Sequence, residues 1–189
     1  MLTKKIILFL FCLLIPGLVW SGTIAQKETK VLVVYYSRTG HTQLVAEKLA
    51  KKFNADLERL IDKKKRIGPI AFLAAGKDAV SANTTVIDPL KHSPKDYDII
   101  LIGGPAWNGH VTPAVRTFIT QNDLSDKKIG LFSSCHYIGV EDALKETANL
   151  ISKGKNQEFP RLALREHEIK EEALTKKIDS FYQAIQEAQ

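Results

Sequence analysis

Three short polar segments each follow an apolar run, and their residue types suit a ligand that is partly anionic and partly planar. The first segment, SRTGHT at 37–42, has three hydroxyl side chains and one glycine. The second is GGPAWNGH at 103–110 and the third is SSCHYIG at 133–139, and each contributes an aromatic ring. Hydroxyl groups can bind a phosphate, whereas aromatic rings stack on a planar group. Such a ligand could bind only if the fold brings the three segments together.

The rest of the chain alternates between strand-like and helix-like patterns. We expect strands at 31–36, 55–61, 96–107, 127–134 and 159–169, and helices at 41–53, 68–82, 112–121, 139–152 and 170–188. Within the first helix, Leu44, Val45, Leu49 and Phe53 predict one buried face. Strands separated by helices pair in parallel through right-handed crossovers. The sequence therefore predicts an α/β fold, a doubly wound five-stranded sheet with helices on both faces. With strand order 2-1-3-4-5, the three polar segments would meet at its carboxyl edge.

The first segment is predicted to hold a phosphate. It offers the hydroxyls of Ser37, Thr39 and Thr42, and Gly40 lets the backbone fold closely. The amino end of the following helix adds unsatisfied N–H groups and a favourable dipole. Arg38 either adds positive charge or faces solvent. The alternative is a plain helix cap, in which Thr39 or Thr42 satisfies the helix amides and nothing binds.

The second and third segments are predicted to hold the planar part of the ligand. Trp107 follows a Gly-Gly-Pro turn beyond a buried strand, where a large indole has little core to enter, so we expect it to form a flat wall. A half-buried tryptophan that merely shields the rim is the alternative. Tyr137 offers an opposite wall, and its neighbours supply polar contacts, namely Ser133, Ser134, Cys135 and His136.

Residues 30–189 resemble the flavodoxin family, and more closely its short-chain members. The resemblance rests on VLVVYYSRTGHT (31–42), DYDIILIGGPAWNGHVTPAVRTFI (96–119) and LSDKKIGLFSSC (124–135). It implies that FMN is bound by residues from all three segments. The phosphate would lie against Ser37, Arg38, Thr39, Gly40, His41 and Thr42, and the isoalloxazine would lie between Pro105, Ala106, Trp107, Asn108 and Gly109 on one side and Ser134, Cys135, His136 and Tyr137 on the other. It also implies that the Asn108–Gly109 peptide flips on reduction; the alternative is that Asn-Gly only makes a tight turn.

Other chemistries lack residues that they require. The first segment has no Gly-Lys-Ser/Thr motif of a nucleoside triphosphate loop, and Cys135 is not followed by the arginine of a cysteine phosphatase. His41, His110 and His136 lie in three separate segments without a paired ligand motif, so no metal site is predicted. DKKKR at 62–66 is interpreted as a solvated loop, with docking of an acidic partner or of lipid headgroups as the alternative.

The amino-terminal residues predict export. Residues 1–25 combine two lysines, an apolar run and small residues near the end, which is typical of a secretory signal peptide, so 26–189 would be the flavodoxin-like domain. An uncleaved membrane anchor is the alternative, and it would be the only membrane contact. Either form places the domain in the periplasm or outside the cell. The net charge of +6 includes two lysines of this stretch, and the remaining basic residues are scattered among acidic ones, so we expect no nucleic-acid partner.

Three functions remain open at this point. The first is an FMN protein in electron transfer, with a redox partner protein or a small-molecule electron acceptor. The second is an NAD(P)H-dependent reductase of quinones or other small molecules, which would turn over both substrates. The third is an exported binding domain that kept the fold and lost the flavin, and such a protein would be colourless.

Overall fold

The computed structural model describes most of the chain after its first 27 residues. The described ranges are 28–66, 68–136, 138–155, 157–169 and 171–188. The predicted signal peptide at 1–25 and the predicted ligand wall Tyr137 both lie outside them. Among the helices within these ranges, none has the length and apolar character needed to cross a bilayer.

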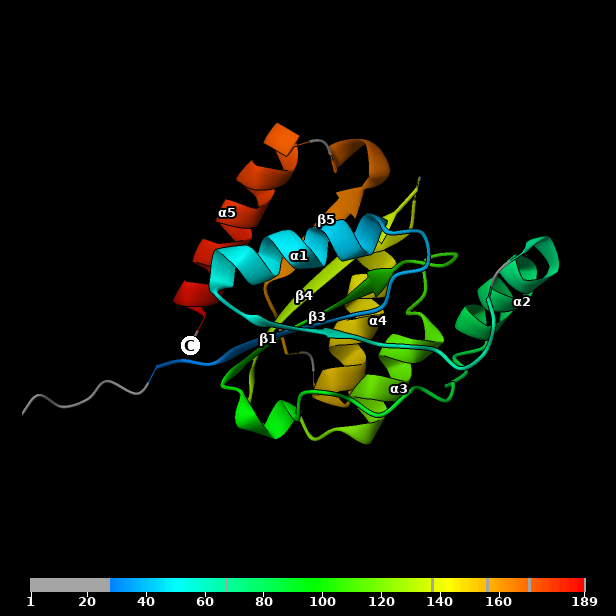
Figure 1. The fold of residues 1–189 in the computed structure, drawn as a ribbon, viewed down its shortest axis with the longest axis horizontal. Helices are drawn as coiled ribbons and strands as arrows, with labels where there is room; N and C mark the ends of the chain where they lie inside the picture. Colours follow the sequence, from blue (N-terminus) through cyan, green and yellow to red (C-terminus); the bar gives the residue numbers. More distant parts are fainter. Residues whose placement is uncertain (1–27, 67, 137, 156, 170, 189) are drawn as a thin grey trace, which may run out of the picture.

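Five parallel strands form one sheet in the order β2-β1-β3-β4-β5, which confirms the predicted topology. Their bounds are Val31–Tyr35 (β1), Asp56–Arg59 (β2), Ile99–Pro105 (β3), Lys128–Cys135 (β4) and Arg161–Arg165 (β5). In register, Val31 pairs with Ile99, which in turn pairs with Lys128. The carboxyl ends of β1, β3 and β4 therefore lie side by side at one edge of the sheet (Figure 1).

Helices cover both faces of the sheet, as predicted. Their bounds are His41–Phe53 (α1), Pro69–Val80 (α2), Pro113–Gln121 (α3), Val140–Ser152 (α4) and Glu171–Glu187 (α5), with short 3-10 turns at Pro94–Asp96 (η1) and Glu166–Glu168 (η2). Figure 1 shows α1 and α5 on one face and α3 and α4 on the other, whereas α2 stands apart from the sheet. The expectation of a strand throughout 159–169 is wrong at its end, because β5 stops at Arg165 and η2 follows.

The helix α1 shows how the sequence pattern positions an element of the site. Val45, Leu49 and Phe53 are buried against the sheet, as predicted, together with Thr42 and Ala46. The inclusion of Leu44 in this face is wrong, because its exposed fraction is 41%. Positions 42, 45, 46, 49 and 53 recur three or four residues apart and share one stripe, and residue 44 lies beside that stripe.

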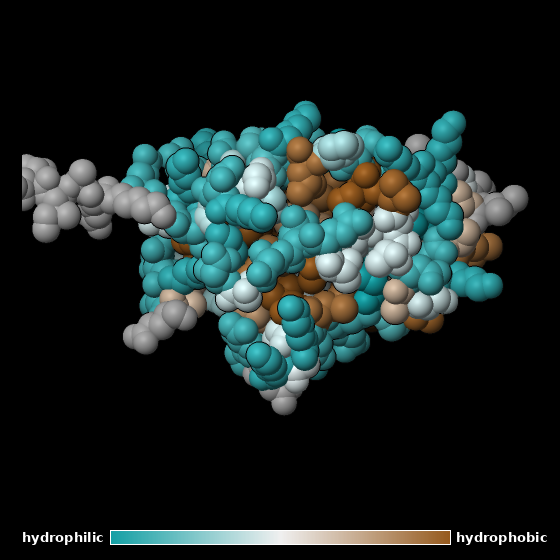
Figure 2. Space-filling model, turned by 90° about the horizontal axis from the view of Figure 1, so that it is seen from below, coloured by the Kyte–Doolittle hydropathy of each residue, from teal (hydrophilic) through white to brown (hydrophobic). Residues whose placement is uncertain are grey.

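The helix α2 is attached differently. Its small residues Ala75 and Ala79 are buried, whereas Leu73 and Val80 are exposed. Figure 2 shows hydrophobic residues on the surface at the right-hand end of the molecule, where Figure 1 places α2. This helix therefore extends the fold past the edge of the sheet and leaves apolar side chains in contact with solvent.

Candidate functional site

A cleft of about 930 Å³ opens at the carboxyl edge of the sheet, where the three polar segments meet. Twelve of the fifteen predicted ligand-binding residues line it: Arg38, Thr39, His41, Thr42, Pro105, Ala106, Trp107, Asn108, Gly109, Ser134, Cys135 and His136. Ser37 and Gly40 are not among the lining residues, and Tyr137 is outside the described ranges. The structure thus brings together segments that are about 20 to 90 residues apart in the sequence, as the predicted strand order requires.

The amino end of α1 reaches the cleft without a side-chain cap. The cap residue is Gly40, with φ at +99°, and it makes no side-chain hydrogen bond to the helix. The Gly40 N–H donates to Ser37 Oγ at 3.2 Å, so Ser37 tightens the loop instead of capping the helix. The alternative interpretation, a cap by Thr39 or Thr42, is therefore wrong. Among the described contacts, no side chain bonds to the first amides of α1. These N–H groups can therefore donate hydrogen bonds to an anion.

Thr42 joins two of the predicted segments directly. Its Oγ1 lies 2.8 Å from Ser134 Oγ, and both side chains are buried. This hydroxyl pair links the first turn of α1 to the carboxyl end of β4. Because each hydroxyl is the other's partner in a buried place, removal of either leaves a polar group unpaired.

Trp107 is more buried than its position in the sequence suggests. Its exposed fraction is 8%, and it packs edge-on against Tyr36 with ring centroids 5.7 Å apart. Two guanidinium carbons, of Arg38 and Arg66, lie 5.2 and 5.7 Å from the indole centroid. The expected Gly-Gly-Pro turn is wrong, because Gly103, Gly104 and Pro105 continue β3. The expectation that the indole has little core to enter is also wrong, because α2 extends the core beyond β3 and Ala75 belongs to the same cluster. Trp107 nevertheless lines the cleft.

The residues after Trp107 form a closed two-residue turn. Trp107 and His110 exchange two backbone hydrogen bonds, of 3.1 and 3.0 Å. Asn108 and Gly109 both have positive φ, at +51° and +80°, which are the torsions of a type I′ turn. The tight turn is therefore present, and the flip of its central peptide stays a prediction. The turn is closely packed, because a Cβ added to Gly139 would lie 2.6 Å from Gly109 Cα.

Seven lining residues of the cleft were not predicted from the sequence. They are Leu73, Gly76, Ile138, Gly139, Asp142, Glu166 and Ile169. Glu166 is the most connected, because its carboxylate lies 3.5 Å from His41 Nε2 and also contacts His136 Nδ1. It follows β5, whose carboxyl end lies at the same edge of the sheet. The strand-end rule could have identified Glu166 if the fifth strand had been predicted to stop at Arg165.

Comparison with known proteins identifies the family. The profile described as "Flavodoxin domain" matches residues 70–171, which is more than half of the chain. This chain belongs to the flavodoxin family. The matched region covers the loops after β3 and β4 but not the SRTGHT segment, so the assignment does not depend on the predicted phosphate loop.

Solved flavodoxin-like structures agree with the fold. A putative flavoprotein from Bacteroides eggerthii is 21% identical, with a TM-score of 0.63, and the match covers 85% of this chain and all of that one. A flavoprotein from Lactobacillus acidophilus in complex with FMN is 19% identical, with a TM-score of 0.60 and coverage of 75% and 97%. Oxidised flavodoxin 2 from Bacillus cereus is 18% identical, with a TM-score of 0.54 and coverage of 84% and 99%.

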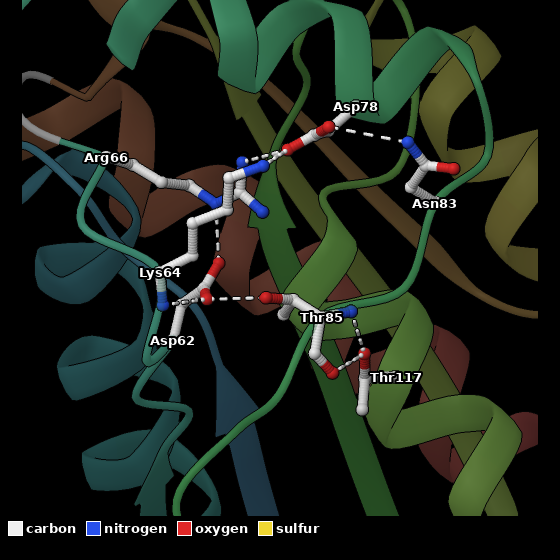
Figure 3. Close-up of polar contacts among 7 residues, drawn as sticks. All are labelled: Asp62, Lys64, Arg66, Asp78, Asn83, Thr85 and Thr117. Carbon is white, nitrogen blue, oxygen red and sulfur yellow. Dashed lines mark hydrogen bonds and ion pairs between the residues drawn. The ribbon is translucent and has the colours of Figure 1, made fainter.

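In this flavodoxin fold, α2 is joined to the loop after β2 by buried ion pairs (Figure 3). Arg66 Nε donates to Asp62 at 2.5 Å, and its Nη1 donates to Asp78 of α2 at 2.7 Å. Burial would lower the pKa of Arg66, but the two carboxylates raise it above its ordinary value. Hydrogen bonds from Lys64 and Arg66 lower the pKa of Asp78 to about 2. The interpretation of 62–66 as a solvated loop is therefore wrong for Arg66, whose exposed fraction is 5%.

The same network extends to α3. Asp62 accepts a hydrogen bond from the Thr85 hydroxyl at 2.7 Å. Thr117 of α3 accepts from the Thr85 N–H at 2.8 Å and donates its hydroxyl proton to the Thr85 carbonyl at 2.9 Å. Figure 3 shows these contacts as one connected group between α2, the loop after β2 and α3. The helix α2, which forms one wall of the flavodoxin cleft, is thus attached to the rest of the fold partly by charged side chains.

Proposed function

We propose that this protein binds FMN in the cleft at the carboxyl edge of the sheet and acts in electron transfer. The single observation that carries the proposal is the meeting of three ligand-type loops in one cleft, with the uncapped amino end of α1 beside it. Membership of the flavodoxin family, and the FMN complex of the Lactobacillus protein, support FMN as the cofactor.

The residues of the cleft fit an FMN-sized ligand. Its volume of about 930 Å³ lies within the range of roughly 300–1,000 Å³ that is usual for small-molecule sites. At the α1 end, Arg38 and His41 supply positive or proton-donating groups, and Thr39 supplies a hydroxyl, all of which suit a phosphate. At the opposite wall, the Asn108–Gly109 turn presents backbone without bulky side chains, which suits close approach of a ring.

Bound FMN would supply the redox chemistry, and the chain would bind, orient and electrostatically tune it. Cys135 also lines the cleft, but it is buried, and burial raises the pKa of its thiol above the ordinary value. It is therefore a neutral thiol at neutral pH and a weak nucleophile. This favours a cofactor held by non-covalent contacts over chemistry at the cysteine.

A reductase of small molecules is the second candidate function. Leu73 and Ile138 both line the cleft, with exposed fractions of 74% and 83%, so its rim offers apolar surface for a second planar molecule. Steady-state oxidation of NADH or NADPH with a soluble quinone distinguishes the two functions. Sustained turnover supports the reductase, and its absence in an FMN-loaded protein supports electron transfer between proteins.

The test of FMN binding is a titration of the purified protein with FMN and, separately, with riboflavin. Because riboflavin lacks the phosphate, it should bind at least about 10-fold more weakly, since each hydrogen bond to a charged group contributes about 1.5–3 kcal/mol. Visible absorption and quenching of flavin fluorescence measure both affinities. A protein that stays colourless and quenches neither flavin contradicts the proposal and favours the flavin-free alternative.

A variant of the first loop locates the phosphate. Thr39→Ala should weaken FMN binding by about 1.5–3 kcal/mol and leave riboflavin binding unchanged. Thr39 is a cleaner choice than Thr42, whose loss would also leave the buried Ser134 hydroxyl without its partner. The exposed Thr84 gives a matched control, because Thr84→Ala makes the same change away from the cleft. Equal FMN affinity in Thr39→Ala and the parent would place the phosphate elsewhere.

A further inference from the structure

The turn at 107–110 is attached to α4 through one carboxylate outside the cleft lining. Glu146 Oε2 accepts the Val111 N–H at 3.0 Å and lies 3.3 Å from His110 Nδ1. Glu146 Oε1 accepts a hydrogen bond from Arg116 Nη2 of α3. The carboxylate therefore contacts the residue that closes the turn, the residue after it, and a neighbouring helix.

The contacts of Glu146 favour its charged form. Burial alone would raise its pKa, but the Val111 amide, Arg116 and His110 together lower the pKa below its ordinary value. Glu146 is thus ionised at neutral pH, and hydrogen bonds to an ionised acceptor are roughly twice as strong as neutral ones. Arg116 in turn depends on Glu146, because Arg116 is itself buried and its Nε has no hydrogen-bond partner among the described residues.

The opposite side of the turn is held by packing. Trp107 is buried in the core, and the backbone of Gly109 is in close contact with Gly139 at the start of α4. On the α2 side, a Cβ added to Gly76 would lie 2.8 Å from Asn108 Nδ2. The arm before the turn (Trp107) is therefore fixed by apolar burial, whereas the arm after it (His110 and Val111) combines the buried side chain of Val111 with the hydrogen bonds and ion pair of Glu146.

Rotation of the Asn108–Gly109 peptide changes the backbone torsions on both of its sides. How easily the peptide rotates therefore depends on how firmly the two arms are held. We propose that Glu146 is a positioning residue that fixes the arm after the turn to α4 and thereby restrains rotation of this peptide beside the cofactor. The restraint on the turn exists whether or not a ligand is bound. Only its effect on the reduction potentials rests on the proposed FMN function.

The first test uses the full chain without FMN. Glu146→Gln keeps the shape and one acceptor but removes the charge, so amide exchange at Val111 should become about 5- to 10-fold faster by NMR. Glu141→Gln is the matched control, since it makes the same change on an exposed residue of the same helix that does not line the cleft. Equal Val111 exchange in Glu146→Gln and the parent overturns the proposal.

The second test adds FMN and measures the two one-electron reduction potentials and the affinity for oxidised FMN. In Glu146→Gln, freer rotation should change the separation between the two potentials, by an amount equal to an about 5- to 10-fold change in the equilibrium constant between the two steps. Affinity for oxidised FMN should stay within about twofold, because Glu146 does not line the cleft. Unchanged potentials in an FMN-loaded variant overturn the effect on the cofactor. If the parent binds no FMN, the proposed function fails, and the exchange at Val111 alone decides the role of Glu146.

Discussion

The helices α1 and α2 both line the cleft, but different forces attach them to the rest of the molecule. Val45 and Leu49 of α1 are fully buried against the sheet, whereas the ion pair of Lys52 with Asp179 of α5 lies on the surface. In α2, the described buried side chains are two alanines, and Asp78 joins Arg66 and Lys64. One wall of the cleft is thus held by apolar burial and the other largely by ion pairs.

The two kinds of attachment should respond differently to substitution and to pH. Apolar burial contributes in proportion to the area removed from water and does not change with protonation. A buried ion pair adds little net stability compared with an apolar pair, but removal of one partner leaves an unpaired buried charge and is costly. The α1 wall should therefore fail only when the whole fold unfolds, whereas the α2 wall can open alone.

The largest effect is expected in α1. Leu49→Ala should lower the global free energy of unfolding by about 2–5 kcal/mol, because it removes a fully buried side chain and leaves a cavity. Urea unfolding monitored by circular dichroism measures this loss. Leu44→Ala, on the exposed side of the same helix, should cost less than about 1 kcal/mol. Equal losses in the two variants would mean that α1 is not held by this face.

An intermediate effect is expected in α2. Arg66→Met should leave Asp62 and Asp78 without their shared partner, so amide protection in α2 should fall by about 10- to 100-fold while that of α1 stays unchanged. Hydrogen exchange with mass spectrometry resolves the two helices. Lys65→Met removes the same charge from an exposed neighbour and should change neither helix. Parallel loss of protection in both helices would show that α2 does not open separately.

The smallest effect is a dependence of α2 on pH. The pKa of Asp78 is about 2 in the fold against 3.8 ordinarily, so its contribution is complete above pH 3.8 and is lost as pH falls through about 2. Protection of α2 amides, corrected for intrinsic exchange, should therefore decline between about pH 4 and pH 2, and that of α1 should decline less. In Asp78→Asn the difference between the two helices should no longer vary over this range.

Local patterns were sufficient to predict a parallel α/β sheet with helices on both faces, whereas the strand order, and with it the meeting of the three loops, came from the resemblance to the flavodoxin family. The local patterns depend on properties that the sequence carries directly, such as the apolar run of β1 and the positions where strands stop. Leu44 was misplaced because an apolar residue beside the buried stripe of a helix looks like a member of it. Trp107 was misplaced because its burial depends on α2, a distant segment that packs beyond the end of β3.

The charged residues of the site could not be predicted because their partners are distant in sequence. Arg66, in the loop after β2, pairs with Asp78 of α2. Glu146 of α4 contacts His110, which lies in a loop 36 residues away in the sequence. A buried arginine and a solvated one look the same in a run such as DKKKR. Only the packing of α2 and α4 reveals which charges are removed from water.

The pairing of β1 with β3 also affects how the chain is made. Val31 cannot form its pair with Ile99 until Ile99 has been synthesised, and β1 lies between β2 and β3 in the sheet. At about 5–20 residues per second, synthesis of the intervening chain takes roughly 3 to 14 s. During this time β1, which is apolar along its whole length, has an unpaired edge. This edge could pair with other chains, so we expect the nascent chain to need chaperones even though the edge is covered in the folded protein.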